Sequence, residues 1–266
     1  MRADIQSIFR YDVKNAGDLY CPPFRYVNLG SQRFTDIMHI KDVASLSPNL
    51  VIGGGGLLGL RTFAPNMNRI FERSYRAVVG WGLGVNTGTD MVSGYVKRTK
   101  CTFPAYMDRF DILGVRDYGT CYPWVPCASC LHPLFQRQWP IENDVVVYEH
   151  KRVPSGIDCF PKMHNDTIDL ERVLRFLGSS RVVITNSYHG AYWSQLMGKA
   201  VLAFPFSSRF YQFKHKITLC KPAEWKKWLD RVEEQPPALQ ECIDANLKFW
   251  KRVRSLLGLA RSHRLK

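Results

Sequence analysis

Short apolar segments alternate with stretches of helical periodicity along most of this sequence, and this alternation limits the possible folds more than any other feature. The segments typical of strands are residues 50–52, 76–80, 112–115, 144–148, 181–185 and 199–204. Helical stretches lie between or after them, at residues 63–73, 91–110 with a break near Pro104, 165–177, 188–197 and from Ala223 onward. Strands connected through helices pair in parallel. The sequence therefore predicts an α/β protein with mainly parallel sheets.

The composition changes between Cys121 and Pro140, where four prolines and several aromatic residues interrupt any regular period. Connections of this kind separate units of structure. We therefore expect two α/β units with a cleft between them, at residues 1–138 and 139–236, followed by a C-terminal helix at 237–266. A length of 266 residues is enough for two such units.

The chain carries 37 lysine and arginine residues against 23 aspartate and glutamate residues, a formal net charge of +14. This excess favours an anionic partner: a phosphorylated substrate, a nucleic acid or an acidic membrane surface. Hydrophobic residues make up 45% of the chain, which excludes a disordered protein. No apolar run reaches the roughly 18 residues that a membrane-spanning helix needs. Residues 1–9 lack the core of a signal peptide, so a cytoplasmic location is expected.

Basic and apolar residues alternate at helical spacing in the last segment of the chain. The cations, which no acid accompanies, are Lys248, Lys251, Arg252, Arg254, Arg261, Arg264 and Lys266. One helical face carries the apolar residues Leu247, Trp250, Val253 and Leu257. A helix of this type either docks on its own domain or lies peripherally on an anionic membrane surface.

The segment Thr185-Asn-Ser-Tyr-His-Gly190 stands where a predicted strand is followed by a predicted helix. The first N–H groups of a helix have no partner within it, and the helix dipole adds partial positive charge, so such a junction binds anions. Ser187, Tyr188 and Gly190 are therefore candidate ligand-binding residues. His189 is placed to transfer a proton or, when charged, to neutralise an anion. The alternative is that His189 only caps a turn.

Four glycines, Gly53 to Gly56, follow the predicted strand at residues 50–52. Because they lack side chains, Gly54, Gly55 and Gly56 let backbone amides approach a bound ligand. The run is neither a phosphate loop with its lysine nor a dinucleotide-binding fingerprint, so ATP and NAD are not favoured. The alternative is a tight turn that lets a strand and a helix pack closely.

Three other segments offer candidate ligand contacts. In the turn sequence Asn15-Ala-Gly-Asp18, the Asn15 and Asp18 side chains either bond their own backbone or face a ligand. Arg116 follows the strand at 112–115, where open α/β sheets bind ligands, and its planar fork suits a phosphate or a carboxylate. The alternative is a surface pair of Arg116 with Asp117. After the last clear strand, the candidates within a hydroxyl-rich basic run are Ser208, Arg209 and Lys214, although such a run is usually solvated.

Cys127 and Cys130 are separated by two residues, with Cys121 before and His132 after them. This spacing is that of half a zinc site, but the chain contains no second pair with the same spacing. Buried thiols are therefore the favoured interpretation, and no metal is expected.

Taken in chain order, the motifs resemble those of the polysaccharide pyruvyltransferase family. The matching segments are Asn15 to Asp18, Gly53 to Leu58, Gly82-Leu-Gly-Val85, Gly114-Val-Arg-Asp117, Thr185 to Gly190 and Phe206-Ser-Ser-Arg-Phe210, which together span nearly the whole chain. The resemblance implies two Rossmann-like domains in a GT-B-like arrangement with a cleft between them. It also implies phosphoenolpyruvate as the donor substrate, no further cofactor, and a pair of sugar hydroxyls as the acceptor.

The resemblance further implies that an arginine after the Gly-Val strand and the histidine of the second domain bind the donor. These positions correspond to Arg116 and His189 here. His189 would then transfer a proton, Asp18 would be a candidate base for the acceptor, and Asn15 would contact the acceptor. The other ligand-binding candidates named above would contact the donor.

The chain departs from the family pattern in one respect. Many relatives carry an arginine before a leucine–histidine pair, whereas this chain has Ser187-Tyr188-His189. Arg209 and Lys214 are the candidates to supply the missing positive charge.

The sequence thus leads to the expectation of a transferase that adds a pyruvate ketal to a sugar or lipid-linked oligosaccharide of a surface-polysaccharide precursor. One alternative is a glycosyltransferase on the same scaffold that uses a nucleotide-activated sugar. A nucleic-acid-binding protein would explain the net charge of +14 directly. The motifs cluster at strand ends, however, and no nucleic-acid-binding module is recognised, so no nucleic acid is expected as a partner.

Overall fold

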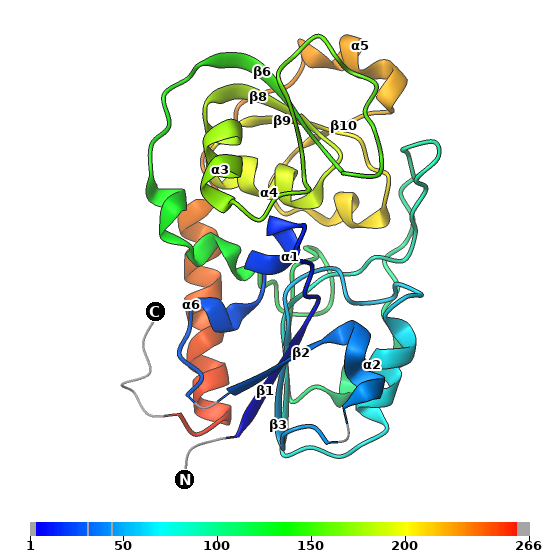
Figure 1. Cartoon of the computed structure of the whole chain (residues 1–266), viewed down its shortest axis with the longest axis vertical. Coiled ribbons are helices and arrows are strands. Elements are labelled where there is room, and N and C mark those ends of the chain that lie inside the picture. The colour runs from blue at the N-terminus through cyan, green and yellow to red at the C-terminus, as the bar shows by residue number, and fades with distance from the viewer. Residues whose placement is uncertain (1–3, 31, 44, 260–266) are drawn as a thin grey trace.

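The structure is a computed structural model that describes residues 4–30, 32–43 and 45–259, and it contains two five-stranded sheets. The first has the order β2-β1-β3-β4-β5, with β1 (Ile5–Phe9), β2 (Gln32–Asp36), β3 (Asn49–Gly53), β4 (Ala77–Leu83) and β5 (Ile112–Val115). The second has the order β10-β9-β8-β6-β7, with β6 (Asn143–Glu149), β7 (Lys162–His164), β8 (Ser180–Thr185), β9 (Ala200–Ala203) and β10 (Thr218–Leu219). Figure 1 shows them at the two ends of the molecule.

Every pairing within both sheets is parallel, which confirms the predicted α/β class. Two parallel sheets of this kind are consistent with two Rossmann-like domains. The α-helices are α1 (Ala16–Tyr20), α2 (Ala64–Phe71), α3 (Leu170–Gly178), α4 (Tyr188–Leu196), α5 (Trp225–Leu229) and α6 (Leu239–Leu256). Short 3₁₀ helices are η1 (Pro23–Arg25), η2 (Ile37–Asp42), η3 (Ala105–Arg109), η4 (Ala128–Leu131), η5 (Pro133–Gln136), η6 (Ser208–Gln212) and η7 (Pro222–Glu224).

The first sheet contains two strands, β1 and β2, that the sequence pattern did not predict. Every residue of β1 is buried, although Gln6 and Ser7 interrupt its apolar run. The Gln6 side chain is satisfied at both ends, because Nε2 donates to Thr35 Oγ1 at 2.6 Å and Oε1 accepts from the Ser47 N–H at 2.8 Å. A polar side chain that is bonded in this way can be buried. The sequence of β1 therefore lacks the continuous apolar run by which a buried strand is predicted.

The predicted helix at residues 91–110 is wrong, since only η3 forms there. The carboxylate of Asp90 accepts from the N–H groups of Val92 and Ser93, at 3.0 and 2.9 Å, which fixes a turn. The backbone N–H of Asp90 and that of Val96 donate to carbonyls beyond β9, those of Phe206 and Pro205. These bonds replace the hydrogen bonds that a helix would need.

Helix α3 begins later than predicted. Its N-cap is Asp169, whose side chain accepts from the Arg172 N–H at 2.9 Å, so the helix does not begin at residue 165. The Asn165 side chain instead accepts from the Lys151 N–H at 2.7 Å, so it holds the segment after β6.

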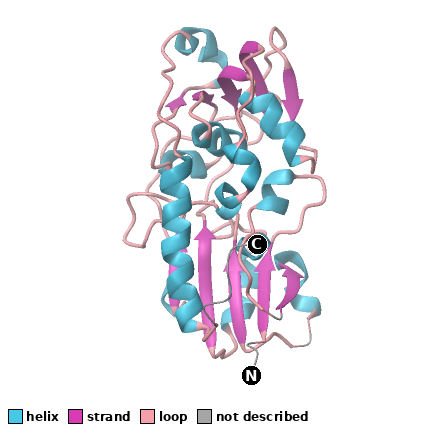
Figure 2. Ribbon diagram, turned by 90° about the vertical axis from the view of Figure 1, so that its left-hand side faces the viewer, coloured by secondary structure: helices cyan, strands magenta, loops and turns pink. Residues whose placement is uncertain are grey.

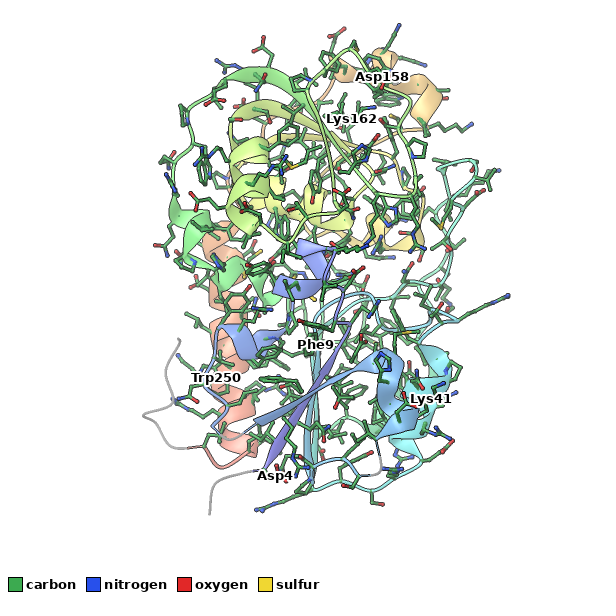
Figure 3. The ribbon with its side chains drawn as sticks, viewed as in Figure 1. Asp4, Phe9, Lys41, Asp158, Lys162 and Trp250 are labelled. Carbon is green, nitrogen blue, oxygen red and sulfur yellow. The ribbon has the colours of Figure 1, made fainter. Side chains whose placement is uncertain are left out.

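Helix α6 follows the second sheet in sequence, but its second half packs on the first (Figure 2). The Trp81 indole of β4 donates to Asn246 at 2.8 Å, and its ring contacts Phe249 and Trp250, which is labelled in Figure 3. The apolar face of the helix is therefore covered by protein, which confirms the first of the two alternatives, docking on its own domain. Contact of anionic lipid with the exposed cations of α6 stays a prediction, and Arg261, Arg264 and Lys266 lie outside the described residues.

The hydropathy of the helices gives one further result. Within the described ranges, no helix is both long enough and apolar enough to cross a membrane.

Candidate functional site

A pocket of about 380 Å³, here called the central pocket, lies where the carboxyl ends of strands from both sheets come together. It is lined by segments that follow β1, β3 and β4 of the first sheet and β6, β8 and β9 of the second. In parallel sheets, the loops at this edge carry the ligand-binding groups. Figure 1 shows α1 at the level between the two sheets, and its Ala16 N–H donates to Thr167 O at 2.7 Å across that level.

The predicted junction between a strand and a helix lies at β8 and α4. Ser187 is the N-cap of α4, and its side chain accepts from the Gly190 N–H at 3.3 Å. No described residue accepts from the N–H groups of Tyr188 and His189, the first two residues of the helix. All three residues from Ser187 to His189 line the central pocket. The junction therefore presents free N–H groups and the positive end of the helix dipole to the pocket.

Arg116 lies at the end of β5, as predicted, and is only 3% exposed. Its three guanidinium nitrogens have no hydrogen-bond acceptor among the described residues. The guanidinium carbon stands 3.6 Å from the centroid of the Tyr188 ring, and Nη2 stands 3.2 Å from where a Cβ on Gly56 would lie. Since Tyr188 and Gly56 both line the pocket, Arg116 lies directly behind its wall. A buried cation without an acceptor is costly, and an anionic ligand would satisfy it.

Asp117 does not form the surface pair with Arg116 that the sequence left open as an alternative. It is buried, and its carboxylate accepts from the Val85 N–H at 2.8 Å. Burial raises the pKa of Asp117 to about 6. Asp117 therefore holds the segment after β4 and leaves Arg116 unpaired.

Arg209 supplies a second cation to the pocket, as predicted. Its Nε donates to Ser207 Oγ at 3.0 Å, and its guanidinium lies 5.9 Å from the Tyr188 ring centroid. Burial and, to a lesser extent, the positive charge of neighbouring Arg116 lower the pKa of Arg209 to about 10. The side chain is therefore still charged at neutral pH, and two guanidinium groups flank one aromatic ring.

His189 is 7% exposed and stands between the two halves of the chain. Its Nε2 lies 3.6 Å from Cys127 Sγ, and a Cβ on Gly17 would come within 2.2 Å of its Nδ1, so α1 needs glycine at that position. Burial and, to a lesser extent, the positive charges of Arg116 and Arg209 lower the pKa of His189 well below its usual value. The imidazole is therefore neutral in the free protein, which fits transfer of a proton better than neutralisation of an anion. The cap of the turn is Ser187, so the capping alternative is wrong as well.

Asn15 and Asp18 both line the central pocket, and they also bond each other. Asn15 is the N-cap of α1, where its Oδ1 accepts from the Gly17 N–H at 3.0 Å and its Nδ2 donates to Asp18 Oδ2 at 3.0 Å. Burial raises the pKa of Asp18. A raised pKa favours the protonated carboxyl, and this suits a proton donor better than the base that was predicted.

The candidate glycines divide into two groups. Gly55 and Gly56 line the pocket, where backbone can approach a ligand. Gly54 has a φ of +80°, and a Cβ there would lie 2.6 Å from the backbone of Cys21. A Cβ on Gly190 would lie 2.5 Å from the Tyr148 ring. Gly54 and Gly190 are therefore packing glycines outside the pocket lining, which corrects their predicted role as ligand contacts.

Two other predicted donor-binding residues lie elsewhere. Ser208 accepts from the Thr87 N–H at 3.0 Å, which ties the segment after β4 to η6. Lys214 pairs with Glu241 and lies 4.4 Å from the ring centroid of Trp124, beside a second pocket along α6. Neither side chain lines the central pocket, so their predicted role there is corrected. Arg209 and Lys214 were the two candidates for the missing positive charge, and of these Arg209 lines the central pocket.

The sequence analysis missed His150, which follows β6 and lines the pocket. Its backbone N–H donates to Asn186 Oδ1 at 2.6 Å, which fixes the residue in place. Its Nδ1 accepts from the Arg152 N–H at 3.3 Å, so the proton of the neutral ring is on Nε2. Burial and, to a lesser extent, the positive charges of Arg209 and Arg152 lower the pKa of His150 to about 4. The strand-end rule that identified Arg116 would have found His150, because β6 was predicted.

Three further lining cations, Arg10, Lys151 and Arg152, were also missed. Arg10 pairs with Asp36, and Lys151 pairs with Asp12 at 3.0 Å. The Lys151–Asp12 pair joins the second sheet to the segment after β1. Arg10 follows a strand that the pattern did not predict, so nothing in the sequence pointed to it.

Cys127 and Cys130 are buried free thiols, as favoured from the sequence. Cys127 Sγ contacts Ser129 Oγ at 3.2 Å as well as His189, and Cys130 Sγ accepts from Asn246 Nδ2 at 3.3 Å. Across the described part of the chain, no three histidine, cysteine or acidic side chains gather as a metal site would require.

Comparisons with known proteins add little to this geometry. No protein-family model matches the sequence, and no curated protein matches it. Among solved structures, an uncharacterized protein from Klebsiella pneumoniae subsp. pneumoniae NTUH-K2044 is similar, with a TM-score of 0.45 and 15% identity. The similarity covers 74% of this chain and 82% of that chain.

Proposed function

We propose that the chain is a transferase that adds a pyruvate ketal from phosphoenolpyruvate to a sugar of a surface-polysaccharide precursor. The central pocket would be the cleft of a GT-B-like pair of domains. The observation that carries the proposal is the buried guanidinium of Arg116, whose nitrogens have no acceptor among the described residues. A small ligand with several negative charges would complete this site.

The charge of the pocket suits phosphoenolpyruvate, which carries a phosphate and a carboxylate. Arg116 and Arg209 offer two guanidinium groups around Tyr188, and the start of α4 offers free N–H groups beside them. Preorganised donors of this kind stabilise charge that moves onto a leaving phosphate. The pocket volume of about 380 Å³ leaves room for part of a sugar beside so small a donor.

The reaction needs one proton donor and one proton acceptor in the pocket. The methylene carbon takes a proton, one sugar hydroxyl adds to the neighbouring carbon and loses its proton, and the carbon–oxygen bond to phosphate breaks. The second hydroxyl then closes the ketal and releases its proton. Asp18, whose pKa is raised by burial, supports the role of acid, and neutral His189, whose pKa is lowered, supports the role of base.

Phosphate release from phosphoenolpyruvate, measured with a panel of hexosides that carry neighbouring free hydroxyls, tests the proposal. We expect release that depends on the acceptor and is lost in Arg116→Met, whereas Lys214→Met, which removes a cation outside the pocket, behaves like the wild type. Release of nucleotide from an activated sugar, with no turnover of phosphoenolpyruvate, would establish the glycosyltransferase alternative instead.

A further inference from the structure

Exposed apolar side chains gather on two loops that border the central pocket. Tyr11 and Val13, on the loop after β1, are 49% and 54% exposed, and Met91 and Val92, on the loop after β4, are 40% and 100% exposed. The same loops contribute Asp12 and Met91 to the pocket lining. Soluble proteins usually scatter exposed apolar residues singly, so a group at one mouth points to a contact surface.

The loop after β4 holds its apolar tip in a defined shape. The Asp90 carboxylate accepts from the Val92 N–H and the Ser93 N–H, and also from Ser93 Oγ at 2.7 Å. The Asp90 N–H and the Val96 N–H donate to the segment after β9, at 2.8 and 2.7 Å. The side chain of Val92 is thus presented to solvent by an anchored turn, and the negative charge of Asp90 is used within the loop.

Unpaired cations lie on the same two loops and in the pocket lining. Lys14 stands on the first loop, Lys97 and Arg98 on the second, and Arg152 beyond β6 next to His150 and Lys151 in the pocket lining. All four are exposed, and none forms an ion pair with a described residue. Apolar tips beside unpaired basic residues match the two layers of an anionic bilayer surface, its acyl boundary and its charged headgroups.

We propose that a rim formed by these residues docks the protein on an anionic lipid bilayer, so that the central pocket opens toward the membrane surface. The rim comprises Tyr11, Val13, Met91, Val92, Lys14, Lys97, Arg98 and Arg152. The proposal goes beyond the transfer reaction, since docking requires neither donor nor acceptor.

Helix α6 offers a clear contrast with the rim. Its cations Lys251 and Arg252 are also exposed, but its apolar residues Trp250 and Val253 are buried against the first sheet. The helix can therefore offer charge to lipid but no apolar side chains from that face. The rim offers both.

Co-sedimentation with vesicles tests the proposal. We expect the wild type to bind vesicles of phosphatidylcholine mixed with phosphatidylglycerol and to bind pure phosphatidylcholine far more weakly. Since each basic residue near the surface changes affinity about fivefold, the double variant Lys97→Glu/Arg98→Glu should weaken binding at least about twentyfold. Its matched control is Lys251→Glu/Arg252→Glu on α6, which should weaken binding much less.

A second pair of variants tests the apolar part of the rim. Val92→Asp should weaken binding several-fold, and Ile141→Asp, an equally polar change at a residue 44% exposed outside the pocket lining, should not. All of these positions are exposed, so thermal unfolding should be unchanged. No binding by the wild type, or a larger loss in the α6 variant than in the rim variants, overturns the proposal. Because the readout needs no catalysis, failure of the proposed reaction leaves this result interpretable.

Discussion

The central pocket holds its cations in two different ways. Behind the inner wall, Arg116 is buried and has no acceptor among the described residues. On the outer wall, Arg10 pairs with Asp36 and Lys151 pairs with Asp12, and the cation side chains are 31% and 21% exposed. Arg10 and Lys151 are already neutralised and join parts of the fold. Our proposal assigns the buried cation to a ligand, whereas the ion pairs of the outer two hold the walls in position.

The two histidines of the pocket differ in the same sense. His189 on the inner wall is nine-tenths buried or more and touches Cys127 from the other half of the chain, while His150 on the outer wall is partly exposed and bonded to Arg152. Both are neutral in the free protein, because burial and nearby arginines lower their pKa. The inner histidine is therefore the better candidate for proton transfer, and the outer one for hydrogen bonding.

The largest effect is expected at His189. His189→Gln keeps a polar side chain of similar size but removes the base, so kcat should fall by about 10²–10⁴-fold. His39→Gln, at an exposed histidine paired with Asp42, is the matched control and should keep the wild-type rate. The measurement is phosphate release under saturating phosphoenolpyruvate, with circular dichroism to check the fold. A rate equal to the wild type would remove His189 from the mechanism.

Arg116→Met should weaken binding of phosphoenolpyruvate by roughly a hundredfold, because a charge-assisted bidentate contact is lost. Removal of a buried cation without an acceptor should at the same time raise the stability of the free protein by about 1–3 kcal/mol. The affinity of Arg116→Lys for phosphoenolpyruvate should lie between that of the wild type and that of Arg116→Met, since lysine lacks the planar fork. Calorimetric titration and thermal unfolding of the same samples check both parts. If Arg116→Met were destabilised but bound phosphoenolpyruvate with normal affinity, the roles assigned to Arg116 and to the outer cations would be reversed.

Anion binding should be linked to proton uptake at His150. Its pKa of about 4 lies below that of an unfolded histidine, and a bound anion should raise it, so affinity for sulfate should increase by up to about tenfold per pH unit as pH falls from about 6.5 toward 4. Sulfate itself does not titrate in this range. Titration in buffers of different ionisation enthalpy counts the protons taken up. His150→Gln should take up fewer protons than the wild type on binding sulfate. An equal number would exclude His150 as the group that is protonated.

The smallest effect is expected at the outer pair. Lys151→Met and Asp12→Asn should each change the free energy of unfolding by less than about 1 kcal/mol, because the pair is partly exposed. Affinity for phosphoenolpyruvate should stay within about threefold of the wild type. A double-mutant cycle in urea measures the coupling. If either variant loses affinity as strongly as Arg116→Met, the distinction between the two walls fails.

Sequence pattern predicted the strands whose interiors are apolar and failed where polar groups are buried and paired. The segments that became β3, β4, β5, β6, β8 and β9 were found because their apolar runs are continuous. Strand β1 was missed because Gln6 is bonded by residues distant in sequence, Thr35 and Ser47. The false helix at 91–110 has the same origin, since its backbone bonds go to residues beyond β9.

The candidate site was found where a residue directly follows a predicted strand or lies at a predicted junction between a strand and a helix. Arg116 and His189 were identified in this way, and the structure brings both to the Tyr188 ring, with His189 contacting it at 5.5 Å between centroids. The protonation of the site was not predictable, because it depends on burial and on Arg209 from another loop. Lys214 was misassigned since its partner, Glu241, lies on α6, and sequence does not show that approach.

The return of α6 to the first sheet also constrains how the chain is made. Trp81 and its neighbours remain uncovered until residues Asn246 to Val253 have left the ribosome, because those residues supply the other half of that layer. The early half of the polypeptide must therefore wait for the late half before its core closes, and during synthesis it exposes Trp81 and the aliphatic residues beside it to chaperones.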